Sequence, residues 1–137
     1  MIKLSKLEYL ANNAVIRKRL STIHLSSLSQ VFIIRQNNSE LGYLILDIYP
    51  DNKKLCIYEL YVLLRFRNKK IGTKIVKYII KYFKQKGFSV ITVVPTPIEN
   101  NDTLGYKETQ EKLKKWYLNL GFSPSDTNRS EYNINLN

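Results

Sequence analysis

The sequence predicts a mixed α+β fold, in which helices flank a central, mostly antiparallel mixed sheet in layers. Three observations predict it. Apolar runs separated by turn residues fill the region from Val31 to Leu63, which is typical of an antiparallel meander. An amphipathic helical pattern at Ile71–Lys86 joins two strand-like runs, which indicates a local parallel pair with a right-handed crossover. A second helical pattern and an alternating run then close the chain.

In the first half of the chain we expect one or two short helices and then three strands. Leucine and alanine recur at helical spacing from Leu4 to Leu20, which predicts the helices. The strands and the turns between them are predicted at Val31–Ile34, Asn37–Ser39, Leu41–Ile48, Pro50–Asn52 and Leu55–Leu63.

The helical pattern from Ile71 to Lys86 is the clearest in the chain. At roughly 100° per residue, four of its lysines fall in one narrow sector, and the apolar residues, including Tyr78 and Tyr82, fill the opposite side. This wide apolar face predicts a helix packed against a sheet, with Gly87 as its stop. The elements expected after it are a strand at Ser89–Val94, a loop at Pro95–Asn101, a helix at Tyr106–Leu120 and a strand at Tyr132–Leu136.

The composition is that of one folded domain over residues 1–137, because 44% of the residues are apolar. No apolar run approaches membrane-spanning length, so we expect no membrane association and a cytoplasmic location. Cys56 is the one cysteine and His24 the one histidine, so neither a disulfide nor a metal site is expected.

Positive charge is concentrated in one segment. Residues 53–86 hold eleven Lys and Arg against one acidic residue, Glu59, a local net charge of +10 out of +11 for the whole chain. Such a segment attracts a polyanion, either a phosphorylated cofactor or a nucleic acid. The alternative is a lysine-rich composition with a solvated helix face.

The turn that opens the clearest helix reads R-N-K-K-I-G-T, Arg67 to Thr73. A strand–turn–helix of this kind presents free backbone N–H groups at the positive end of the helix dipole, where phosphate binds. The turn resembles the acetyl-CoA-binding motif of the GNAT acetyltransferase superfamily, (Arg/Gln)-x-x-Gly-x-(Gly/Ala). Arg67 and Gly72 match this motif, and Lys70 stands where the family usually has its first glycine.

A second motif supports the same resemblance. W-Y-L-N-L-G-F, Trp116 to Phe122, is similar to the second GNAT signature, (Phe/Leu)-Tyr-x-x-x-Gly-Phe, and the two occur in the family's order. The resemblance implies a GNAT-like layered fold and one N-acetyltransferase domain. It also implies acetyl-CoA as co-substrate, whose acetyl group passes by direct attack to a primary amine in a ternary complex.

The resemblance also implies which residues form the site. The main chain of Leu60, Tyr61 and Val62 would bind pantetheine, and one of these amides would polarise the thioester carbonyl. The residues implied for the phosphates are Arg67, Asn68, Lys69, Lys70, Ile71, Gly72 and Thr73, with Lys74 as a further candidate. Tyr117 matches the family's general acid, and Glu59 is the candidate general base, because an alkyl amine with a pKa of about 10.4 must lose a proton to attack.

Each assignment has a structural alternative. Gly72 is also what close helix packing requires, and the lysines also suit a solvated face. Glu59 is equally well explained as a surface glutamate paired with a lysine, since alternation places it opposite Leu60 unless a bulge intervenes. Tyr117 also fits a core stripe of its helix. His24 is expected at the surface and Cys56 in the core, and Gln110 stands where many family members carry asparagine.

Other functions stay open. One is a GNAT-fold protein that binds a ligand with weak or no catalysis, which the Lys70 substitution keeps in view. Another is acetylation of an RNA-borne amine rather than a small molecule or a protein. A nucleic-acid-binding module would need exposed aromatic residues between basic ones, and Tyr78 and Tyr82 are expected on the apolar side, so nucleic acid is not favoured. Assembly as a homodimer is left open.

Overall fold

The computed structural model describes residues 1–98 and 105–137. Its strands are β1 (Ile2–Lys6), β2 (Ser29–Gln36), β3 (Ser39–Tyr49), β4 (Lys54–Val62), β5 (Val90–Val93), β6 (Ser123–Pro124) and β7 (Tyr132–Asn135). Its helices are α1 (Ala14–Thr22), α2 (Ile71–Gln85) and α3 (Tyr106–Asn119), with 3-10 turns η1 (Pro50–Asn52) and η2 (Leu64–Phe66). None of the helices in this described part of the chain is long and apolar enough to cross a membrane.

The strands form a single sheet, in the order β1-β2-β3-β4-β5-β7-β6. The β4–β5 pair is parallel, and the other pairs are antiparallel. The strand–helix–strand unit predicted around α2 makes this parallel pair, because its crossover returns the chain in the same direction. The mixed, mostly antiparallel sheet with flanking helices is therefore confirmed.

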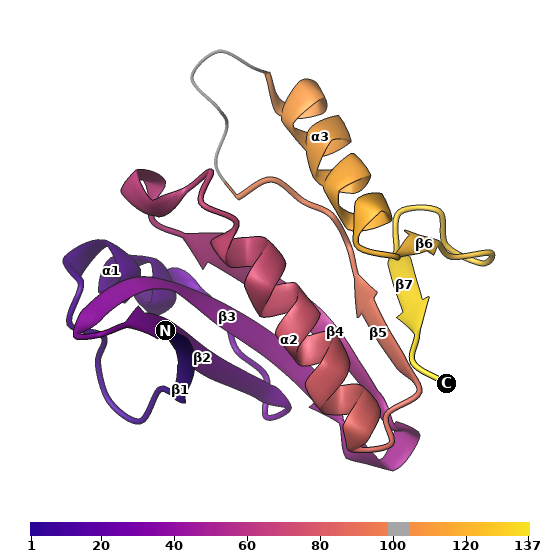
Figure 1. Ribbon diagram of the computed structural model, residues 1–137, viewed down its shortest axis with the longest axis horizontal. Coiled ribbons are helices and arrows are strands. Elements are labelled where there is room, and N and C mark those ends of the chain that lie inside the picture. The colour runs from indigo at the N-terminus through magenta and orange to yellow at the C-terminus, as the bar shows by residue number, and fades with distance from the viewer. Residues whose placement is uncertain (99–104) are drawn as a thin grey trace.

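The helices divide between the two faces of the sheet. The α2 residues Ile75, Ile79 and Phe83 join the core on one face, and Tyr117 of α3 joins the same core. Ile16 of α1 is fully buried in a second core with Tyr43 and Tyr61 on the other face. Figure 1 shows α2 running along β3 and β4, with α3 beside β5 and β7. The layers predicted from the sequence are those of the structure.

The start of the chain differs from the prediction. Residues 2–6 form a strand, β1, which pairs with β2 from Ile2 opposite Gln36 to Lys6 opposite Phe32. A helix does follow, but it begins at Ala14, where the side chain of Asn13 caps it by accepting hydrogen bonds from Val15 N and Ile16 N. The helical spacing from Leu4 to Leu20 misled because pairing with a distant strand overrides a local pattern.

The other boundaries follow the predictions closely. Gly87 and Gly121 end their helices with φ of 82° and 105°, the left-handed conformation that glycine adopts freely. Residues 95–98 of the predicted Pro95–Asn101 loop are irregular, and the rest of that loop lies outside the described residues.

One face of α2 was predicted wrongly. Tyr78 and Tyr82 were expected to face the sheet, but they are 54% and 41% exposed. The buried sector is narrower than expected, since the buried residues of α2 are Ile71, Ile75, Val76, Ile79 and Phe83. The tyrosines therefore lie at the margin, next to the lysines.

Candidate functional site

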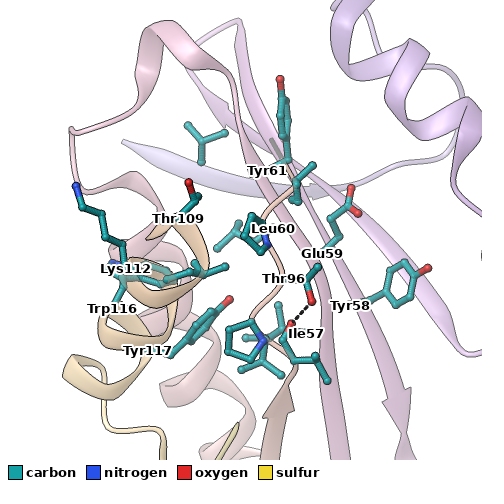
Figure 2. Close-up of a pocket in the computed structure, with 18 of the residues that line it drawn as sticks. Ile57, Tyr58, Glu59, Leu60, Tyr61, Thr96, Thr109, Lys112, Trp116 and Tyr117 are labelled. Atoms are coloured by element: carbon teal, nitrogen blue, oxygen red, sulfur yellow. Dashed lines mark hydrogen bonds between the residues drawn. The ribbon is translucent and has the colours of Figure 1, made fainter. Parts of the chain in front are cut away.

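A cleft opens where β4 and β5 separate. The two strands pair from Lys54 opposite Val90 to Ile57 opposite Val93, and beyond this point β4 continues without β5 as a neighbour. The cleft has a volume of about 1060 Å³ and is lined by both strands, by residues 94–98 and by α3 (Figure 2). A volume of this size accommodates an organic ligand.

A β-bulge in β4 shapes the wall of this cleft. The register with β3 runs from Glu59 opposite Ile45 to Ile57 opposite Leu46, so Tyr58 is an additional residue. Ile57 and Leu60 consequently lie on the face that packs against α2 and α3, whereas Tyr61 packs on the α1 face. Despite the bulge, the side chains of Glu59 and Leu60 lie on opposite faces of the sheet. The carboxylate of Glu59 contacts Tyr43 and Arg19 on the α1 face.

The backbone of β4 presents polar groups to the cleft at Leu60. Leu63 N donates to Leu41 O at 2.8 Å, so Leu63 faces β3. Alternation along an antiparallel ladder then directs the backbone groups of Tyr61 toward β3 and those of Leu60 and Val62 toward the cleft. Val62 O accepts a hydrogen bond from Arg67 Nε at 2.7 Å, which ties the following turn to the strand.

The turn before α2 has an unusual backbone. Asn68 and Lys70 adopt φ of 63° and 62°, the left-handed region in which a residue with a side chain is strained. Lys70 is the N-cap of α2, and its own side chain makes no capping hydrogen bond to the N–H groups of the first turn. These groups, from Ile71 to Thr73, therefore lie at the positive end of the helix dipole, ready for an anion.

Gly72 and Thr73 pack against the second motif. A Cβ at Gly72 would lie 3.4 Å from Trp116 Cζ2 and 3.8 Å from Leu60 Cδ2, so the helix lies close to both residues. The indole N–H of Trp116 donates to Thr73 Oγ1 at 3.1 Å. Gly72 thus does allow close helix packing, and this packing brings the two motifs into contact.

Tyr117 lies on the α3 side of the cleft. It is 4% exposed and packs edge-on against Trp116 and Phe122, with ring centroids 4.8 and 5.3 Å away. Its hydroxyl points into the cleft (Figure 2) and makes no hydrogen bond with any residue that the structure describes. Burial raises the pKa of this phenol, and the nearby Cys56 raises it further, so it is protonated at neutral pH.

Glu59 belongs to a polar cluster on the α1 side. The Tyr43 hydroxyl donates to Glu59 Oε2, Arg19 Nε donates to Tyr43 Oη at 3.2 Å, and Arg19 Nη2 is 3.9 Å from Glu59 Oε2. The Arg19 guanidinium also lies over the Tyr61 ring, 4.2 Å from its centroid. Burial, with the hydrogen bond to Glu59, raises the pKa of Tyr43. Among the described residues, Oε1 of Glu59 has no partner.

The cleft brings together part of the predicted site. The predicted residues that line it are Glu59, Leu60, Tyr61, Val62, Arg67, Asn68, Gly72 and Tyr117. The side chain of Ile71 is buried in the core, so only its backbone is available to a ligand. Lys69 and Lys70 are exposed at the turn, and Thr73 is held by Trp116.

Two residues near the cleft were not predicted from the sequence, and a third has a different environment from the one predicted. Arg19 and Tyr43 had no signal in the sequence, because they reach Glu59 from α1 and β3. Cys56, expected in the core, is half-buried and lines the cleft. Gln110 Nε2 donates to Pro95 O at 3.3 Å, which holds α3 to the chain after β5, and His24 is exposed as expected.

Comparison with known proteins adds the family. A family model described as an acetyltransferase (GNAT) domain matches residues 27–124. No curated protein matches the chain in sequence.

Solved structures share the fold at low identity. A GNAT-family acetyltransferase from Staphylococcus aureus Mu50 has a TM-score of 0.60 and 21% identity, over 81% of this chain and 70% of that one. The ribosomal-protein-S18-alanine N-acetyltransferase of Escherichia coli has a TM-score of 0.60 and 12% identity, over 99% and 94%. AtaTR bound with AcCoA has a TM-score of 0.65 and 16% identity, over 98% and 93%.

Proposed function

The chain belongs to the GNAT acetyltransferase family, and from this premise we propose that it is an N-acetyltransferase. In this proposal residues 1–137 form one such domain, which transfers the acetyl group of acetyl-CoA to a primary amine. The amine attacks directly in a ternary complex. The observation that carries the proposal is the cleft between β4 and β5, which places the Leu60 backbone, the turn before α2 and Tyr117 around one space.

The cofactor side of the cleft suits acetyl-CoA. Leu60 offers an N–H and a C=O to pantetheine as a further strand would. The first turn of α2, from Ile71 to Thr73, which the side chain of Lys70 does not cap, offers N–H groups to the pyrophosphate. Lys69 and Lys70 supply positive charge beside it. A solved GNAT-fold structure with AcCoA bound supports this choice of ligand.

The two catalytic roles fall on opposite sides of the cleft. The amine of the acceptor loses its proton to Glu59, directly or through water, and attacks the thioester carbonyl carbon. An N–H from β4, at Leu60 or Val62, stabilises the negative charge on the carbonyl oxygen. The C–S bond then breaks, and Tyr117 donates its phenolic proton toward the leaving sulfur as general acid. Because a thiol has a reference pKa near 8.5, this anion needs only modest stabilisation.

Glu59 is arranged for its role. Tyr43 and Arg19 both engage Oε2, which fixes the carboxylate, and Oε1 is left for the acceptor. The surface alternative, a pair with an exposed lysine, does not describe this cluster, since the cation is Arg19 and the side chain of Glu59 is 19% exposed.

A thermal-shift experiment tests the proposal. Acetyl-CoA should raise the unfolding temperature, by more the further its concentration exceeds its Kd, and adenosine should not, because it lacks the phosphates and pantetheine. Release of free thiol in the presence of a panel of primary amines should follow. No stabilisation by millimolar acetyl-CoA would contradict the cofactor assignment, and stabilisation without thiol release with any amine would favour a non-catalytic binding protein.

A further inference from the structure

The solvent-exposed side of α2 carries positive charge without any acidic residue. The helix and the residue after it contain five lysines, and neither Asp nor Glu occurs from Ile71 to Lys86. All five are exposed: Lys74, Lys77, Lys81, Lys84 and Lys86. An uncompensated row of this kind repels itself, and a polyanion relieves that repulsion.

Two tyrosines lie beside these lysines. The rings of Tyr78 and Tyr82 stack with their centroids 6.0 Å apart and their planes inclined by 24°. Lys86 Nζ lies 5.5 Å from the centroid of the Tyr82 ring. A solvated lysine face has no need of exposed aromatic rings, so this pair distinguishes the surface from one that only keeps the protein in solution.

The surface is separate from the cleft. Gly72 and Thr73 face Trp116 and so mark the side of α2 that faces α3. At roughly 100° per residue, Tyr78 and Tyr82 lie on the other side of the helix. None of the five lysines or two tyrosines lines the cleft. The four lysines of one sector, from Lys74 to Lys84, extend for about 15 Å, long enough for several phosphates of one strand.

We propose that this surface of α2 binds single-stranded nucleic acid. Lysine ammonium groups pair with successive phosphates, and unpaired bases stack on the rings of Tyr78 and Tyr82. An anionic membrane is the poorer fit, because the exposed apolar groups are phenols rather than the Leu, Phe or Trp that insert into lipid. An acidic peptide would satisfy the lysines and leave the aromatic faces unused. The surface is independent of the acetyl transfer proposed above.

The first test separates this surface from general positive charge. Fluorescence anisotropy with a labelled single-stranded oligouridylate is measured across about 50 to 200 mM salt. The surface variant carries Lys77→Gln, Lys81→Gln and Lys84→Gln. The control variant loses the same charge at exposed positions elsewhere, with Lys18→Gln, Lys107→Gln and Lys115→Gln. Lys74 is kept, since it is a candidate for the cofactor phosphates.

In the surface variant the slope of log K against log salt should be shallower than in wild type by about 2, as expected for three lost contacts to a single strand. The control variant should keep the wild-type slope. Equal losses in both variants, or no binding by wild type at the lowest salt, would overturn the proposal. Unchanged thermal shifts with acetyl-CoA would show that the cofactor site is intact, so this result and the fate of the proposed enzyme activity stay separate.

The second test concerns stacking. Tyr78→Ala with Tyr82→Ala should weaken oligouridylate binding by roughly tenfold or more without changing the salt slope. Both residues are exposed, so the unfolding temperature should stay near that of wild type. Unchanged affinity would overturn the proposal, and so would tighter binding of polyglutamate or phosphatidylserine vesicles than of the oligonucleotide.

Discussion

The indole N–H of Trp116 donates a hydrogen bond to the hydroxyl oxygen of Thr73 across 3.1 Å, from α3 to the first turn of α2. The two residues are 43 positions apart in the sequence, and their contact joins the two sequence motifs. Beside it, Gly72 lies against the same indole ring. The start of α2 is therefore held by α3, the helix that also carries Tyr117.

Thr73→Val should loosen this junction. Valine keeps the shape of threonine but accepts no hydrogen bond, so a partly buried indole N–H loses its partner at a cost of about 1 kcal/mol in unfolding free energy. Urea unfolding measures the loss, and a double-mutant cycle with Trp116→Phe isolates it. Additive losses from the two single variants would contradict a direct contribution of the bond. We also expect weaker acetyl-CoA binding, since the turn is less fixed.

Tyr117→Phe should lower the rate of thiol release by about a hundredfold, while acetyl-CoA binding stays close to wild type. Phenylalanine preserves the edge-on contacts with Trp116 and Phe122 and removes only the hydroxyl that faces the cleft. Tyr106→Phe is the matched control, because this tyrosine lies on the same helix and is exposed. A wild-type rate in the Tyr117 variant would leave the residue a role in packing alone.

Glu59→Gln should reduce the rate most at neutral pH. Glutamine keeps an oxygen for the Tyr43 hydroxyl but accepts no proton, so the variant depends on acceptor that is already neutral. Its rate should rise about tenfold per pH unit toward the amine pKa near 10.4, and the deficit against wild type should shrink on the way. The profile is measured with one simple alkylamine. A deficit that is constant with pH would argue for a structural role of the carboxylate.

Local patterns predicted the centre of the fold well. The alternation and turns from residue 31 to 63, and the periodicity of α2, depend on neighbours in sequence. β1 could not be predicted in this way, because five residues with two apolar side chains become a strand only by pairing with β2. The same limit applies to the margin of α2: periodicity gives the direction of Tyr78 and Tyr82, and only the sheet below decides how far the buried sector extends.

In the candidate site too, some features follow from local sequence and others depend on the folded sheet. The turn from Arg67 to Thr73 and the position of Tyr117 follow from contiguous motifs. The surroundings of Glu59 do not, because Arg19 and Tyr43 come from other elements and meet the carboxylate only in the folded sheet. The bulge at Tyr58 was considered from alternation but could not be located without the pairing of β3 and β4.

Substitutions at Lys70 can separate an effect on stability from an effect on acetyl-CoA binding. With φ of 62°, its backbone suits glycine, so Lys70→Gly should leave stability unchanged or raise it by up to about 1 kcal/mol. Lys70→Ala keeps the strain and should give no such gain. Both variants lose the ammonium group, and if it contacts a phosphate both should bind acetyl-CoA more weakly. Chemical unfolding and calorimetric titration measure the two effects. Wild-type affinity in both variants would remove Lys70 from the list of ligands.

Buried tyrosines should make the fold sensitive to alkali. Burial raises the pKa of Tyr117 above its unfolded value of about 10, so in that range the unfolded chain loses a proton that the folded chain keeps. The stabilisation is complete below pH 10 and is lost as pH rises, by about 1.4 kcal/mol per pH unit for each such group.

Burial also raises the pKa of Tyr43, so this residue should add an equal loss of unfolding free energy per pH unit. Unfolding free energies from urea titrations between about pH 9 and 11 measure the slope. Tyr117→Phe should make it shallower by one group's share, whereas Tyr106→Phe should keep the wild-type slope. An unchanged slope in the Tyr117 variant would mean that its hydroxyl meets water in the folded cleft as freely as in the unfolded chain, and the phenol would then lack the protected proton that its role as general acid uses.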